Sequence, residues 1–159
     1  MKKILMIALL CTFSYMTVSA QDVYKEILRI SKKGAADETK GLELRRIFQF
    51  KVDELNYMLM KTREQMPDSS MHMVDTQAYA MYDFVNSYLK DISKKDKKKD
   101  KELIKTIYKE ATIHNSRFND MDKDLVLSYY NREDYITQFS LDTDWIKAMA
   151  EVKRVLSNL

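Results

Sequence analysis

The sequence predicts an all-α protein, a compact antiparallel bundle of four to six helices that follows a cleaved signal peptide. Apolar residues recur at intervals of three or four along several long segments, which is the period of a helix with one buried face. The 159-residue chain has two glycines and one proline, whereas average usage would give about eleven and about eight. Because turn-rich β folds need these residues at defined positions, their scarcity favours long helices joined by few tight turns.

Residues 1–20 are expected to be a signal peptide that is removed after Ala20. Two lysines follow the first methionine, residues 4–10 are apolar, and a pattern of small residues ends at Ala20. The apolar stretch is shorter than the ~20 residues of a membrane-spanning helix, although a retained N-terminal membrane anchor is the main alternative. Cys11 follows a leucine rather than a small residue, so no lipid anchor is expected. The protein is therefore predicted to be exported, either to the periplasm or to the extracellular medium.

Residues 21–159 are expected to form a single helical-bundle domain without a disulfide, because the only cysteine, Cys11, lies in the removed segment. The stability of this domain must then come from packing. Removal of Lys2 and Lys3 leaves 25 of the 27 basic residues against 24 acidic residues, a net charge of +1. A nearly neutral domain outside the cytoplasm is not expected to bind nucleic acid.

The first helix is predicted over residues 21–33, with Gly34 placed to end it. The second and longest helix is predicted to begin near residue 38 or 42 and to end at residue 65, before Pro67. Its apolar residues recur at the helical period, so they are expected to form one buried stripe. The stripe consists of Leu44, Phe48, Val52, Leu55, Leu59, Thr62 and Met66.

Four further helices are predicted downstream, over residues 70–93, 100–118, 120–130 and 134–139. The last helix is expected to start after Asp142 or Thr143, because either side chain is a suitable N-cap. Its buried stripe consists of Trp145, Met149, Val152, Leu156 and Leu159. The connections between the longer helices are short, which predicts that neighbours run antiparallel.

No enzymatic activity is predicted. The Gly-rich phosphate loop, the dinucleotide fingerprint and the nucleophile elbow are absent from the sequence. A serine triad would have to use His72 or His114, the only two histidines, and no serine lies in a Gly-flanked turn. No cofactor is expected either.

Met71, His72 and Met73 are the candidate metal ligands. Thioethers are soft ligands that suit Cu(I), and imidazole can complete such a site. In an exported protein without cysteine, methionine is the remaining soft ligand. The alternative is that these methionines fill gaps in the core, since methionine adapts to irregular packing.

A lysine-rich segment lies between the third and fourth predicted helices and is a candidate for binding anionic surfaces or polymers. The alternative is a solvated connection that the like charges keep extended. The six basic residues of this lysine run are Lys94, Lys95, Lys97, Lys98, Lys99 and Lys101.

Four aromatic residues form the candidate interaction surface, two on each of the two longest predicted helices. They are Phe50, Tyr57, Tyr79 and Tyr82. Phe50 and Tyr57 lie almost opposite the main stripe of their helix, and exposed aromatic side chains favour recognition of a protein or a sugar. The alternative is that this helix packs against neighbours on two sides, so that the second stripe is also core.

The leading functional prediction is an exported, non-catalytic domain that acts by protein–protein interaction or assembly in the cell envelope, with a partner protein or as a homo-oligomer. Two alternatives remain. One is a carrier that holds a small hydrophobic ligand or a soft metal ion between its helices. The other is a domain that binds anionic envelope surfaces, including the membrane surface, through the lysine run.

Overall fold

The computed structural model describes residues 23–69, 71–130 and 138–159. The predicted signal peptide lies outside the described residues, and so does most of the helix predicted over residues 134–139. Within the described part, the chain forms helices and no strand. These helices are α2 (Val23–Ala36), α3 (Leu42–Gln65), α4 (Met71–Ser93), α5 (Lys98–His114), α6 (Lys123–Tyr130) and α7 (Trp145–Leu156). The all-α prediction is confirmed for these residues.

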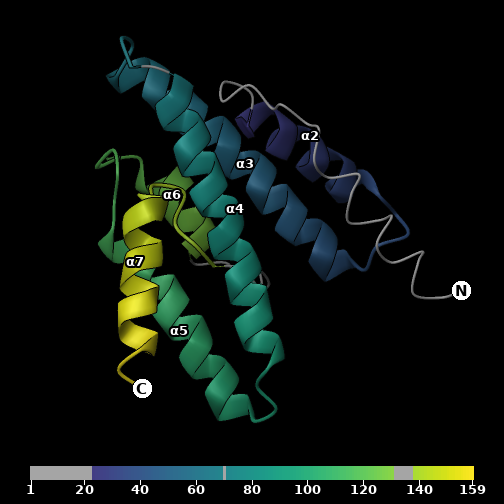
Figure 1. The fold of residues 1–159 in the computed structure, drawn as a ribbon. Coiled ribbons are helices and arrows are strands. Elements are labelled where there is room, and N and C mark those ends of the chain that lie inside the picture. Colours follow the sequence, from purple (N-terminus) through teal and green to yellow (C-terminus); the bar gives the residue numbers. More distant parts are fainter. Residues whose placement is uncertain (1–22, 70, 131–137) are drawn as a thin grey trace, which may run out of the picture.

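Helices α2, α3 and α4 lie side by side and run up and down, while α5 and α7 pack together on the other side of α4 (Figure 1). Helix α4 contacts α2, α3, α5 and α7 and is therefore central to the packing. No helix in the described residues has the length and the apolar character needed to cross a membrane.

Helix boundaries follow the sequence closely for α3 and α4 and less closely elsewhere. Helix α5 starts two residues before the predicted residue 100 and ends at His114 rather than at residue 118. The N-cap of α7 is Asp144, whose side chain accepts a hydrogen bond from the backbone N–H of Lys147. Asp142 and Thr143 are buried but do not cap this helix.

Gly34 was expected to end the first helix, but it lies inside α2. A Cβ atom at this position would lie 2.5 Å from the ring of Phe48 on α3. Glycine is therefore required here because two helices approach closely, and not because the backbone leaves the helical conformation. The prediction of a helix stop at Gly34 was wrong for this reason.

The core is built around a cluster of aromatic rings at the centre of the molecule. Trp145 and Phe84 are fully buried, with ring centroids 5.2 Å apart in an edge-to-face arrangement. Phe50 and Phe139 also contact Trp145 edge to face, and Phe84 contacts Tyr108 in the same way. This geometry places the positive edge of one ring on the negative face of the next.

Candidate functional site

Phe50 and Tyr57 are part of the core and not of a surface, which corrects their assignment to the interaction surface. Phe50 is 0% exposed and packs edge to face against Tyr129 of α6 and Trp145. Tyr57 is 4% exposed and donates a 2.9 Å hydrogen bond to Oδ2 of Asp120. Because α3 has neighbours on two sides, its second aromatic stripe is buried as well.

The two tyrosines of α4 differ from this pair and from each other. Tyr79 is 65% exposed. Tyr82 is half-buried, and the ammonium of Lys51 lies 4.3 Å from the centre of its ring. Of the four residues predicted for one interaction surface, Tyr79 is therefore the fully exposed member.

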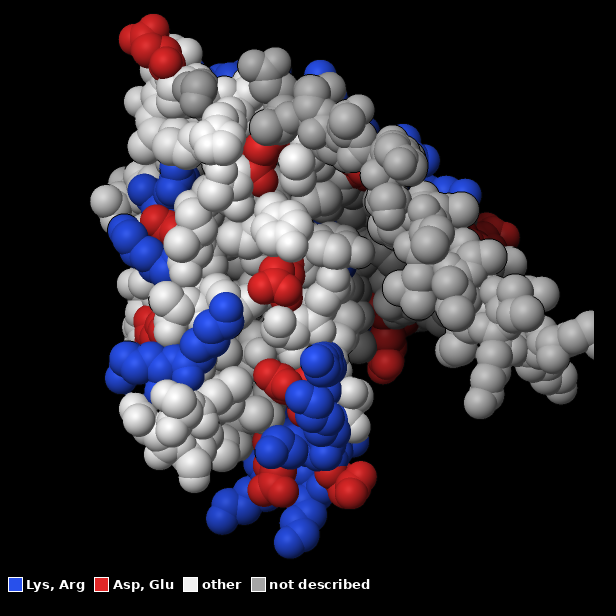
Figure 2. All heavy atoms as spheres, viewed as in Figure 1, with Lys and Arg blue, Asp and Glu red and all other residues white. Residues whose placement is uncertain are grey.

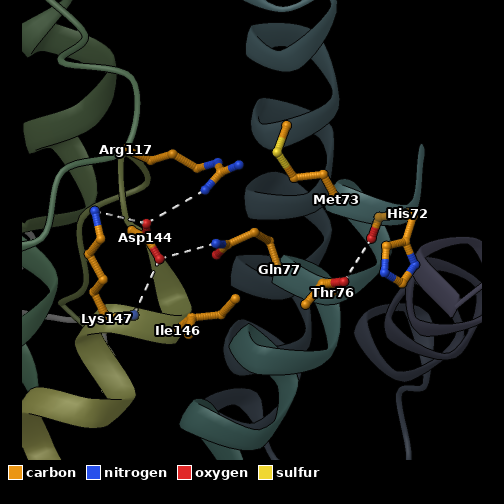
Figure 3. Close-up of a pocket in the computed structure, with 8 residues that line it drawn as sticks. All are labelled: His72, Met73, Thr76, Gln77, Arg117, Asp144, Ile146 and Lys147. Atoms are coloured by element: carbon orange, nitrogen blue, oxygen red, sulfur yellow. Dashed lines mark hydrogen bonds and ion pairs between the residues drawn. The ribbon is translucent and has the colours of Figure 1, made fainter. Parts of the chain in front are cut away.

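A pocket of about 420 Å³ lies between the first turns of α4 and the start of α7. Figure 3 shows how side chains from α4, from the segment after α5 and from α7 surround it. Its lining residues are His72, Met73, Thr76, Gln77, Arg117, Asp144, Ile146 and Lys147. The volume is within the ~300–1,000 Å³ of small-ligand sites.

Gln77 holds α4 and the beginning of α7 together at the floor of this pocket. Its side-chain amide nitrogen donates to Oδ1 of Asp144 at 3.1 Å, and its amide oxygen accepts the backbone N–H of Trp145 at 2.8 Å. Gln77 is 3% exposed, so both hydrogen bonds are shielded from water. These two hydrogen bonds thus fix the pocket wall that the two helices form.

Asp142 fixes the segment that carries Arg117. Its Oδ1 accepts backbone N–H groups of Arg117 at 3.0 Å and Phe118 at 2.7 Å, and its Oδ2 accepts that of Asp120 at 2.9 Å. A carboxylate that accepts several backbone N–H groups makes strong hydrogen bonds. The backbone from which the Arg117 side chain reaches the pocket is consequently fixed.

The charges at the pocket are two cations and one anion. Oδ2 of Asp144 lies 3.6 Å from Nη1 of Arg117 and 3.4 Å from Nζ of Lys147. Burial alone would raise the pKa of Asp144, but the hydrogen bonds from Gln77 and from the Lys147 backbone, with the two cations, hold it below its ordinary value. Asp144 is therefore ionised at neutral pH, and these three side chains carry a net charge of +1.

One donor at this site has no acceptor. Nε of Arg117 is shielded from water and makes no hydrogen bond. Figure 3 shows the thioether of Met73 extending toward this guanidinium, while Ile146 is 48% exposed at the other side of the opening. The pocket therefore combines a cationic group of unfilled hydrogen-bonding capacity with an apolar wall, which suits a ligand that has an anionic and an apolar part.

The three predicted metal ligands are not brought together. Met71 is half-buried against the core, and His72 is exposed. Met73 and His72 both line the pocket, but Figure 3 shows the imidazole on the other side from the thioether. Among the described residues, no three His, Cys, Asp or Glu side chains form a group that would hold a metal ion.

The lysine run covers the connection after α4 and the first turn of α5, and its six side chains are exposed. Figure 2 shows basic side chains gathered at this end of the molecule with acidic side chains among them. Nζ of Lys94, for example, lies 2.9 Å from Oδ1 of Asp91. Neighbouring carboxylates therefore reduce the positive field of the run.

A second pocket, of about 380 Å³, lies between α3 and α6. Its lining residues are Asp53, Asn56, Tyr57, Met60, Tyr129 and Leu141. The hydroxyl of Tyr129 donates a hydrogen bond to Asp53 across it. Residues 131–137, which follow α6, lie outside the described part of the chain.

Sequence reasoning missed Arg117, Gln77 and Asp144 as site residues. The Asp-Thr-Asp sequence before α7 signals a helix cap, but nothing local shows that Gln77, 67 residues earlier, bonds to Asp144. Comparison of the chain with protein-family models, with curated proteins and with solved structures finds no match in any of the three.

Proposed function

We propose that this protein is an exported, non-catalytic binding domain that recognises a partner protein through the surface where α4 meets the start of α7. The observation that carries the proposal is the exposure of Tyr79 on α4 and of Ile146 on α7, at 65% and 48%. Ile146 lines the pocket that contains Arg117, and Tyr79 lies three residues after Thr76, which also lines it. We call the surface formed by His72, Thr76, Tyr79 and Ile146, together with the pocket that His72, Thr76 and Ile146 line, the α4–α7 surface.

The composition of the α4–α7 surface supports protein recognition. Interfaces are enriched in aromatic residues, methionine and arginine, and the residues that contribute most to affinity are commonly tyrosine, tryptophan and arginine beside a pocket. His72, Thr76 and Tyr79 are all exposed and share one face of α4, since they are separated by four and three residues. Tyr79 therefore lies on the same exposed face of α4 as His72 and Thr76, two residues that line the pocket.

The rigidity of the pocket also supports the proposal. The hydrogen bonds of Gln77 and Asp142 fix α4, α7 and the Arg117 segment before any partner arrives. A surface that is ordered in advance loses less conformational entropy when it binds. The partner therefore meets a preformed site and not a loop that must fold.

Export is the second part of the proposal and rests on the sequence of residues 1–20. Mass spectrometry of the protein from cells that express the whole gene tests it, because cleavage after Ala20 would leave Gln21 as the first residue. Retention of residues 1–20 in the isolated protein would exclude a cleaved signal.

Site-specific photocrosslinking tests recognition. A photoreactive phenylalanine analogue replaces Tyr79 in the native host, and a second variant carries it at Leu103 of α5, which is 46% exposed. We expect one discrete crosslinked protein from position 79 and none from position 103. Equal crosslinking at both positions would show non-specific contact. A crosslink to a second copy of this chain would show that the surface mediates self-assembly and does not bind a different protein.

A further inference from the structure

We infer that the pocket of the α4–α7 surface receives an acidic side chain of the partner protein, a glutamate or aspartate that has an apolar residue next to it. This inference rests on the proposed function and adds the chemistry of the bound segment. It follows from three features of the pocket: the unfilled donor of Arg117, the net positive charge, and the apolar wall of Met73 and Ile146.

The guanidinium of Arg117 is the anchor for the carboxylate. A guanidinium has five N–H donors in a planar fork that matches the two oxygens of a carboxylate. In the structure its Nη1 lies 3.6 Å from Asp144, which is an ion pair and not a close hydrogen bond, and its Nε has no acceptor. A buried donor without an acceptor is unfavourable, so Arg117 gains when a turn of its side chain brings Nε to an oxygen of the ligand carboxylate. Without that turn Nε is shielded from the pocket as it is from water.

The electrostatic field at the pocket permits a second carboxylate beside Asp144. Asp144 is shared between Lys147 at 3.4 Å and Arg117 at 3.6 Å, so one carboxylate faces two cations and the three side chains keep a net charge of +1. The Lys147 side chain is 68% exposed, so its flexible stem can turn toward a ligand without disturbing the core. With a bound anion the pocket would hold two positive groups, Arg117 and Lys147, and two negative groups, Asp144 and the ligand. An incoming cation would instead meet two positive side chains.

The apolar wall explains why a bare anion is not the preferred ligand. Ile146 is 48% exposed, and Met73 is half-buried with its thioether directed toward Arg117 (Figure 3). Methionine adapts its shape to different ligands because its side chain is unbranched and flexible. A leucine or similar residue adjacent to the acidic residue would cover Ile146 while the carboxylate reaches Arg117.

The experiment is an NMR titration of the purified protein with the peptide acetyl-Leu-Glu-Leu-amide, followed at the methyl groups of Met73 and Ile146. The matched peptide with Gln in place of Glu and the small acid hexanoate are titrated separately. We expect saturable shifts with the Glu peptide, at least tenfold weaker binding of the Gln peptide, and weaker binding of the Glu peptide as salt increases. Equal binding of the Glu and Gln peptides would overturn the inference.

Variants that each remove one positive charge test where the carboxylate of the Glu peptide binds. Arg117→Gln should weaken binding of the Glu peptide at least tenfold, or about 1.4 kcal/mol, and Lys147→Gln should weaken it to a smaller extent. Because Lys147 is exposed, its replacement tests the site even if Arg117→Gln perturbs folding. Arg154→Gln, which removes the same charge from an exposed position near the end of α7, should bind as the wild type does. Unchanged binding in both pocket variants would overturn the inference.

The outcomes separate the two proposals. A crosslinked partner at position 79 together with no response to the Glu peptide would overturn this inference and leave the proposed function intact. Hexanoate binding as tightly as the peptide would also overturn it, because the site would then be one for a small free acid. Peptide binding that depends on Arg117, in a protein that crosslinks to nothing, would support the carboxylate chemistry and contradict the partner proposal.

Discussion

The indole Nε1–H of Trp145 donates a 2.7 Å hydrogen bond to Oε1 of Glu54 in the centre of the core, which joins the first residue of α7 to the middle of α3. Glu54 is 1% exposed, and its other carboxyl oxygen has no hydrogen-bond partner. Burial raises the pKa of Glu54 well above 4.5, although the hydrogen bond from Trp145 opposes the rise and the charge of Asp142 adds to it. Glu54 is therefore a carboxyl group that the fold keeps protonated above its ordinary range.

Glu54 should make the protein less stable as the pH rises. The unfolded chain releases this proton near pH 4.5, whereas the folded protein retains it to higher pH. The free energy of unfolding should therefore fall above pH 4.5, by at most about 1.4 kcal/mol per pH unit, until the folded carboxyl also ionises. Glu54→Gln keeps an oxygen for Trp145 and cannot ionise, so this part of the pH dependence should disappear.

Urea unfolding of the wild type and of Glu54→Gln at a series of pH values, followed by the fluorescence of Trp145, measures how the free energy of unfolding of each protein depends on pH. Trp145 is the only tryptophan in the chain, so the signal reports directly on the core. Glu43→Gln, at an exposed position of the same helix, controls for the loss of one carboxylate. If the free energy of unfolding depended on pH in the same way in the wild type and in Glu54→Gln, the raised pKa of Glu54 would be contradicted.

Lys51 should make the protein more stable as the pH rises in the alkaline range, which is the opposite of the effect of Glu54. It is 3% exposed, its Nζ donates to Oδ1 of Asn86 at 3.2 Å, and burial lowers its pKa from 10.5 to about 8. The folded protein then loses this proton at lower pH than the unfolded chain does. The contribution of Lys51 to the free energy of unfolding should therefore rise between pH 8 and pH 10.5.

The comparison is between the wild type and Lys51→Met, with Lys33→Met on the exposed side of α2 as the control. The rise should be lost in Lys51→Met and retained in the control. The ring face of Tyr82 at 4.3 Å favours the charged form and opposes part of the shift. If Lys51→Met and the wild type changed equally between these pH values, the lowered pKa would be wrong.

Gly34→Ala should destabilise the protein even though alanine favours helices. The new Cβ would lie 2.5 Å from the Phe48 ring, so the ring or one of the two helices must shift. We expect a loss of about 1–3 kcal/mol in the free energy of unfolding. Gly41→Ala is the matched control, because nothing lies within 4 Å of its Cβ position. Phe48→Leu in the Gly34→Ala background should recover part of the loss, and equal stability of the two alanine variants would exclude the clash.

Phe50→Ser should lower the thermal stability strongly, while Tyr79→Ser should leave it unchanged. Phe50 is 0% exposed, and deletion of a buried phenylalanine side chain costs about 3–5 kcal/mol. Tyr79 is 65% exposed, and such surface changes stay within about 0.5 kcal/mol. Thermal unfolding followed by circular dichroism distinguishes the two. A folded Phe50→Ser variant whose oligomeric state alone had changed would restore the original surface hypothesis for this residue.

Local sequence patterns were sufficient to predict the helical elements. Helix α3 begins at residue 42, one of its two predicted starts, and ends at the predicted residue 65, and α4 differs from its prediction by one residue at its start. The agreement is close because helix formation depends on the 3.6-residue apolar period and on nearby caps and breaks. The same patterns wrongly predicted that Gly34 ends the first helix. A glycine near a helix end and a glycine at a helix crossing look identical in sequence, and only the position of Phe48 distinguishes them.

The sequence by itself determined which residues form helices and which stripes are apolar, whereas the tertiary structure decided which stripes are buried and where a site exists. Phe50 and Tyr79 are both aromatic residues in long helices, yet one is enclosed by α6 and α7 and the other is exposed. The pocket joins Gln77 to Asp144 across 67 residues. Hydrophobic periodicity is a local property of the chain, but burial and side-chain convergence depend on how distant helices pack, and that information is not contained in any one segment.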